Sequence, residues 1–266
     1  MRCARRFSTA NVSLPTRLVS LLTYTCGPTV NFGVTFAVGG LNVWYLAHLG
    51  DTMVDLVGQA LRQLFRADIS LGEVDCQVGI NRQNMRTRSE SQLEDSFAVY
   101  VKGCGADANV VHKAPERGET VFSRDPHRAL LAGGRMANQL LRFMGQIPLD
   151  VLEPTIRMRL VSGSLSLQKS PTRKQVREMA LNGDNSSHFT WWARQSIAYP
   201  DSRKSVDYDV QVWLLGELKM FWLEGEVCAD LGIALKQTQE GPVMTAAYTN
   251  ACPGYISSAR LIRERV

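Results

Sequence analysis

The stretch that decides the fold is Val210–Glu226, which reads VQVWLLGELKMFWLEGE. Its apolar segments Val210–Leu215 and Leu218–Leu223 flank Gly216-Glu217, and glycine at the first central position suits a two-residue type II′ turn. We therefore expect a β-hairpin. Apolar residues then recur at helical spacing from Val227, so Glu226 is expected where a strand gives way to a helix. A carboxylate at that point is stabilised by the helix dipole.

The chain downstream repeats this order of strand, loop and helix. Val243–Tyr248 is expected to form a strand and Thr249–Tyr255 a loop, and Ser257 or Ser258 is suited to cap a further helix. This order places Glu226 and Tyr255 on one edge of a sheet, where α/β proteins often bind ligands. The alternative is that Glu226 is only a charge at a helix start and Tyr255 only packs on its loop.

The rest of the chain alternates in the same way. We expect helices over 43–65, 125–144 and 227–237 and strands near 73–80, 155–161, 206–223 and 243–248. This alternation predicts an α/β fold, a mixed β-sheet flanked by helices in a single domain over 41–266, with residues 1–40 unassigned. The second helix is expected to bury one apolar face, formed by Leu130, Leu131, Met136, Leu140, Leu141 and Met144.

Four stretches occur in an order typical of one known family. They are LEGEV followed by GIALK, within 223–236; YTNACPGYISSARLIRE, at 248–264; VGINR, at 78–82; and KGCGADAN, at 102–109. Together they resemble the catalytic N-terminal domain of the neutral/alkaline, non-lysosomal ceramidases. The matches are spread over residues 41–264, so the chain is similar to a partial or truncated member of that family.

The resemblance implies a zinc-dependent hydrolase that cleaves the N-acyl amide bond of ceramide to give sphingosine and a fatty acid. The family holds its zinc with two histidines, a glutamate and a tyrosine. The matching motifs place Glu226 and Tyr255 in the metal site, and Asp107 and Asn109 in the catalytic loop, where Asn109 would stabilise an oxyanion. The alternative for Asp107 and Asn109 is that they cap a turn, for which both residue types are well suited.

The chain departs from the family in its histidines. Neither residues 1–40 nor residues 83–101 contain one, although the resemblance places the two zinc histidines in the corresponding segments. The four histidines present are His48, His112, His127 and His188. Only His112 lies near a matched motif, so we expect an incomplete zinc site. The sequence therefore leaves two functions open: a zinc-dependent ceramidase, or a catalytically inactive ceramidase-like binding or vestigial protein.

Charge and hydrophobicity limit the classes of binding partner that we expect. The net charge of +5 is scattered along the chain, which argues against nucleic-acid binding. No run reaches the roughly 18–20 apolar residues that span a bilayer, so no transmembrane segment is expected.

The six cysteines have no zinc-finger spacing, and Cys104 and Cys228 are expected to be small core residues. The family is often secreted or periplasmic, but residues 1–40 show no convincing signal peptide, so the localisation is left unassigned. A lipid amide is the partner that the resemblance implies.

Overall fold

The protein is described here from a computed structural model that covers residues 42–73, 101–108, 111–113, 120–122, 126–144, 146, 149–167, 171–184, 188–198 and 204–264. The helices are α2 Val43–Arg62, α3 Pro126–Met144, α4 Arg173–Asn182, α5 His188–Ala198, α6 Ala229–Gln237 and α7 Ala259–Glu264. The strands are β1 Ser70–Leu71, β2 Val111–Lys113, β3 Thr120–Phe122, β4 Asp150–Val151, β5 Ile156–Ser166, β6 Ser205–Leu215, β7 Leu218–Leu223, β8 Glu226–Val227, β9 Val243–Ala246 and β10 Tyr255–Ile256.

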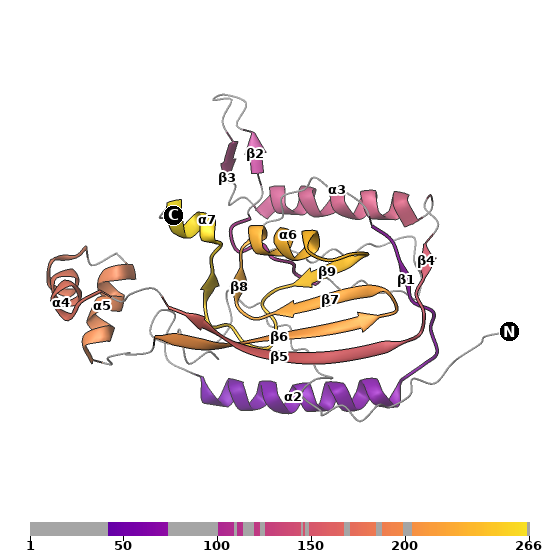
Figure 1. Cartoon of the computed structure of the whole chain (residues 1–266), viewed down its shortest axis with the longest axis horizontal. Helices are drawn as coiled ribbons and strands as arrows, with labels where there is room; N and C mark the ends of the chain where they lie inside the picture. Colours follow the sequence, from indigo (N-terminus) through magenta and orange to yellow (C-terminus); the bar gives the residue numbers. More distant parts are fainter. Residues whose placement is uncertain are drawn as a thin grey trace.

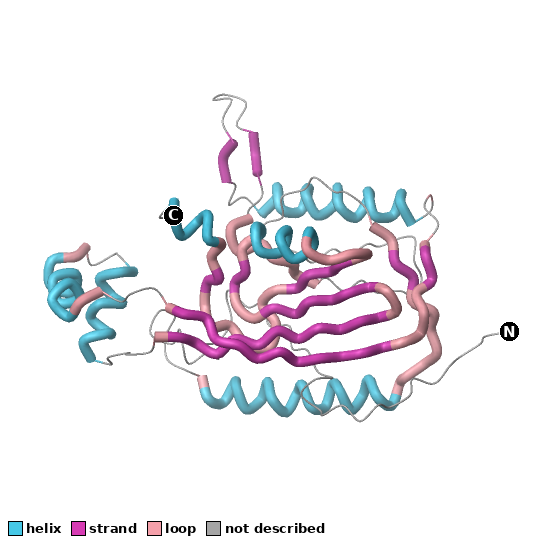
Figure 2. Tube along the Cα trace, in the orientation of Figure 1, coloured by secondary structure: helices cyan, strands magenta, loops and turns pink. Residues whose placement is uncertain are grey.

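A four-stranded mixed sheet with helices around it forms the centre of the molecule. Its strand order is β5-β6-β7-β9, in which β6 pairs antiparallel with both β5 and β7, and β9 pairs parallel with β7. In the view of Figure 1, α2 runs along the β5 side, α3 along the opposite side, and α6 beside β9; Figure 2 shows the same layout by element type. The predicted α/β class with a mixed, helix-flanked sheet is confirmed.

The predicted hairpin joins the two central strands. Leu215 pairs with Leu218, which leaves Gly216 and Glu217 as the two turn residues. Gly216 has φ 57°, while Glu217 is not among the residues with positive φ, as a type II′ turn requires. Glycine also fits sterically, because a Cβ at residue 216 would lie 3.0 Å from the backbone nitrogen of Glu153.

The hairpin strands are followed by a crossover that turns the sheet from antiparallel to parallel. The chain leaves β7, passes through β8 and α6, and returns as β9, which pairs with β7 from Lys219↔Val243 to Trp222↔Ala246. A parallel pair needs such a connection because a tight turn can only join antiparallel strands. Leu223, Val227, Ala247 and Tyr248 form the buried centre of this region, and α6 packs on it through Leu231 and Leu235.

The two faces of the sheet carry different side chains. Val210 pairs with Leu223 and Gln211 with Trp222, so alternation along the strands puts the leucine and the tryptophan on opposite faces. Trp213 shares the face of Trp222, and the two indole rings lie 5.1 Å apart, tilted by 58°. Gln211 is fully buried on that same face.

One expectation about a helix face is corrected, and one expected strand lies mostly outside the described residues. No residue of α2 is buried, and the face of α3 that was expected to be buried leaves Leu130, Leu131, Leu140 and Met144 exposed. The reason is that the described part of the chain places no second apolar layer against these faces; among the described side chains of α3, only small residues such as Ala132 are buried. Most of the strand expected at 73–80 lies outside the described residues, and β1 at Ser70–Leu71 precedes it.

Candidate functional site

The candidate site is built on two short parallel strands, β8 and β10. Tyr255 of β10 is the register partner of Glu226 of β8, and Ile256 is the partner of Val227. Partners in adjacent strands lie on the same face of the pair, about 4.8 Å apart between strand axes. The structure therefore brings together the two residues that the resemblance placed in a metal site. They do not lie on the edge of the central sheet as expected, because β8 and β10 form a separate two-stranded sheet.

Backbone geometry forces this close pairing. The Gly225 N–H donates to the Ala251 carbonyl at 2.9 Å, and the Glu226 N–H donates to the Gly254 carbonyl at 2.8 Å. Gly225 has φ 74°, and a Cβ there would meet the Gly254 carbonyl oxygen at 2.7 Å. A glycine before Glu226 is thus required twice, by its left-handed conformation and by the approach of the 251–254 loop.

The loop expected to be catalytic reaches the same place. The Ala106 N–H donates to the Val227 carbonyl at 3.0 Å, and the Asp107 carboxylate accepts from the Ala229 N–H at 2.8 Å. Asp107 therefore caps α6, whose own N-cap residue, Cys228, makes no side-chain cap. Asn109 lies outside the described residues.

The groups around the Tyr255 hydroxyl favour its protonated form. Its pKa is raised, first by partial burial, then by a hydrogen bond with Cys228, and further by the negative charges of Asp107 and Glu226. Half of the Tyr255 side chain is nevertheless exposed, whereas Cys228 is fully buried. The result is a neutral phenol beside a glutamate at an accessible surface.

A second polar cluster ties α6 to the chain that follows Tyr255. Asp230 accepts from the Ser258 hydroxyl at 2.7 Å and from Arg260 Nε at 2.9 Å, and Ser258 in turn caps α7 through the Leu261 N–H at 3.3 Å. These two hydrogen bonds hold the pKa of Asp230 below its usual range. Sequence reasoning found Ser258 as a possible cap but missed Asp230 and Arg260, because nothing in the local pattern links Asp230 to residues 28 and 30 positions away.

The described residues do not form a zinc site. Among them, no three His, Cys, Asp or Glu side chains are grouped so as to hold a metal ion. His48 is exposed on α2 and His127 is exposed on α3, while the side chains of His112 and His188 are not described. A catalytic zinc normally has three protein ligands, so Glu226 and Tyr255 alone do not fit it. No helix in the described part of the chain has the length and apolar character needed to span a membrane.

Comparison with known proteins adds little. No family model matches the chain, and no curated protein matches it. The chain is similar to the crystal structure of neutral ceramidase from Pseudomonas aeruginosa, with 10% identity, 59% of this chain covered and a TM-score of 0.37. It spans 31% of that protein. A likeness this weak carries no argument about activity.

Proposed function

We propose that this chain is a ceramidase-like protein that binds an N-acyl lipid amide at the Glu226–Tyr255 pair without rapid hydrolysis. The observation that carries the proposal is the register pairing of these two residues, which belong to two separate motifs of the ceramidase resemblance. The 101–108 loop, which carries a third motif, contacts Val227 of β8 and Ala229 at the start of α6. Two neighbouring motifs near the end of the chain and a third more than 100 residues upstream thus meet at one surface.

The chemistry of the pair suits an uncharged polar head group. A tyrosine is protonated at neutral pH even at its ordinary pKa, and the surroundings of Tyr255 raise that pKa further, so its hydroxyl is a donor for an amide carbonyl. Glu226, as a carboxylate, is an acceptor for a hydroxyl or an amide N–H of the same ligand. Zinc, if held, would polarise the carbonyl and activate water, but the described residues do not complete its ligand set and the proposal includes no such step.

Calorimetric titration with a short-chain ceramide such as N-hexanoyl-sphingosine tests the proposal. Glu226→Gln and Tyr255→Phe each remove one hydrogen-bonding partner, and we expect each to weaken binding by about five- to tenfold, the effect of one hydrogen bond. Glu217→Gln in the hairpin turn and Tyr45→Phe on α2 are matched controls, expected to bind as the parent does. Unchanged binding in both site variants would refute the proposal.

Zinc-dependent hydrolysis is the second candidate, with His112 as the additional ligand. It is favoured by one observation: His112 lies on β2, which follows closely on the loop that contacts Val227 and Ala229. This candidate predicts one zinc ion per chain by elemental analysis, lost in both Glu226→Ala and His112→Ala, together with release of fatty acid. The binding function predicts substoichiometric zinc in the parent protein and no release.

A further inference from the structure

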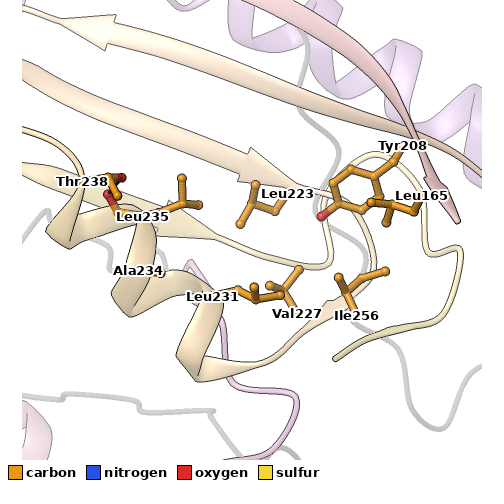
Figure 3. Close-up of a pocket in the computed structure, with 9 residues that line it drawn as sticks. All are labelled: Leu165, Tyr208, Leu223, Val227, Leu231, Ala234, Leu235, Thr238 and Ile256. Atoms are coloured by element: carbon orange, nitrogen blue, oxygen red, sulfur yellow. Dashed lines mark hydrogen bonds between the residues drawn. The ribbon is translucent and has the colours of Figure 1, made fainter. Parts of the chain in front are cut away.

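An open apolar groove of about 360 Å³ lies between α6 and the central sheet. Figure 3 shows side chains from the sheet, from β8 and β10, and from α6 converging on it. The lining residues are Leu165, Tyr208, Leu223, Val227, Leu231, Ala234, Leu235, Thr238 and Ile256. Its volume is near the lower end of the range of small-molecule sites, roughly 300–1,000 Å³.

The two polar side chains of the lining are already engaged. The Tyr208 hydroxyl donates to the Glu224 carbonyl at 2.9 Å, and the Thr238 hydroxyl donates to the Leu235 carbonyl at 3.0 Å. Burial also raises the pKa of Tyr208, so that phenol does not ionise in the groove. An occupant therefore meets hydrocarbon and no charged side chain, and a polar or charged ligand body would lose its hydration without compensation.

The groove is separate from the candidate site. Val227 and Ile256 line it, whereas Glu226 and Tyr255 are the preceding residues of the same two strands. Successive side chains of a strand point to opposite faces, so the groove and the polar pair lie on opposite sides of the β8–β10 pair. A ligand in the groove is thus not in contact with the groups assigned to amide recognition.

We propose that this groove binds one unbranched alkyl chain of medium length, held by the hydrophobic effect alone, with the head group of the amphiphile left in solvent. The lining chemistry selects hydrocarbon, the volume admits a single chain, and the open side leaves room for a head group of any charge. Alkyl-chain binding in the groove does not depend on the proposed function, because the groove and the Glu226–Tyr255 pair lie on opposite sides of the β8–β10 pair.

Two amphiphiles that share a ten-carbon chain test the proposal: decanoate, with an anionic head group, and decyl maltoside, with a neutral one, both below their micellar concentrations. Calorimetric titration is expected to show saturable one-to-one binding of both, with a negative heat-capacity change. Affinity should rise by up to about fourfold per methylene from octanoate to decanoate, as expected for ~0.8 kcal/mol per buried CH₂. Binding of decanoate alone would overturn the proposal, because it would require recognition of the carboxylate.

The variant Ala234→Phe fills the groove from α6 and is expected to weaken both amphiphiles at least tenfold. Ile233→Phe adds an aromatic ring to the adjacent, exposed position of the same helix and is the matched control, expected to bind as the parent does. Methyl NMR of the unmutated protein provides a readout that does not depend on the folding of a variant. Leu235 and Ile256 methyl signals should shift on titration while those of Ile262 on α7 do not. Undiminished binding to Ala234→Phe, or shifts confined to other methyls, would refute the proposal.

Discussion

The Asp107 carboxylate and the Ala229 backbone N–H are joined by a 2.8 Å hydrogen bond that spans 122 residues of chain. It supplies the cap that Cys228 does not provide. It also fixes the 101–108 loop against the strand that carries Glu226, so one contact connects helix stability to the geometry of the candidate site.

Asp107→Ala is expected to lower the free energy of unfolding by about 1 kcal/mol, the usual effect of losing an N-cap side chain. Asp107→Asn keeps an acceptor oxygen and should lose only part of this. Urea titration of both variants measures the difference. If Asp107 acted only on a ligand and did not cap α6, both variants would be as stable as the parent protein. They would then differ from the parent only in ligand binding or turnover.

Gly232→Ala is expected to destabilise the protein even though alanine is the better helix former. A Cβ at residue 232 would lie 2.8 Å from Cys104 Cβ and 3.0 Å from its sulfur, so the loop or α6 must shift. Overpacking of this kind costs about 1–3 kcal/mol, against about 1 kcal/mol gained in helix propensity. Thermal unfolding measures the net effect.

Gly50→Ala is the control for this prediction. Gly50 lies on α2, and a Cβ there meets nothing within 4 Å, so only the propensity gain remains and the helix should become more stable.

The double variant Cys104→Gly/Gly232→Ala tests the contact between residues 104 and 232 directly. It should lose less stability than the sum of the two single changes, because the clashing atoms of Cys104 are gone. A loss of stability in the double variant equal to the sum of the two single losses would contradict a contact between residues 104 and 232.

Asp230→Asn should remove part of the acid sensitivity of the fold. The folded-state pKa of Asp230 is lowered by its hydrogen bonds with Arg260 and Ser258, so its stabilisation is present above the unfolded pKa, about 3.9, and is lost as the pH falls through the folded value. The stability difference between parent and variant should therefore be constant near pH 5–7 and disappear in more acidic solution. Denaturant titrations across this range test it; a difference that persists at pH 2 would assign the effect to another cause.

Trp222→Phe is expected to lower the free energy of unfolding by less than an ordinary truncation of a core side chain does. The indole nitrogens of Trp213 and Trp222 are buried and have no hydrogen-bond partner in the described structure, and an unsatisfied buried donor costs about 1–3 kcal/mol. Phenylalanine removes this penalty while losing some packing, so we expect a change within about 1 kcal/mol. Leu223→Ala on the other face loses packing alone and should cost about 2–5 kcal/mol. If urea titration showed equal losses of stability for Trp222→Phe and Leu223→Ala, an unsatisfied Trp222 N–H would not account for the result.

Local chemistry accounts for what was predictable from the sequence. Gly216 marked the hairpin because its turn needs one residue with positive φ, and Ser258 was expected as a helix cap, which it forms on α7 through the Leu261 N–H. The start of α6 after Glu226 also followed from periodicity. Each of these features depends on residues within a few positions of one another.

Contacts between distant segments account for what was missed. The separate β8–β10 pair, the Asp107 cap and the Asp230–Arg260 ion pair join residues that no local pattern connects. Periodicity identified α2 and α3 but not their burial, because an apolar stripe shows which face is available for packing and not whether the chain supplies a partner. The sequence-derived assignment of Glu226, Tyr255, Asp107 and Asn109 to a reaction stays a prediction.

The ladder between β5 and β6 has an implication for how the chain tolerates insertion. Its last register pair is Ser166↔Ser205, and the Leu167 N–H extends it by donating to the Lys204 carbonyl at 2.8 Å, so the segment carrying α4 and α5 leaves and re-enters the sheet at adjacent points. Figure 1 shows these two helices beyond the end of the strands, and Arg194 on α5 bonds the Ala180 carbonyl of α4. Because the entropy of closing a loop grows only with the logarithm of its length, the strands constrain this segment very little. The unit of α4 and α5 is therefore an insertion between two paired strands, and it can be exchanged for another helical unit without changing the register of β5 and β6.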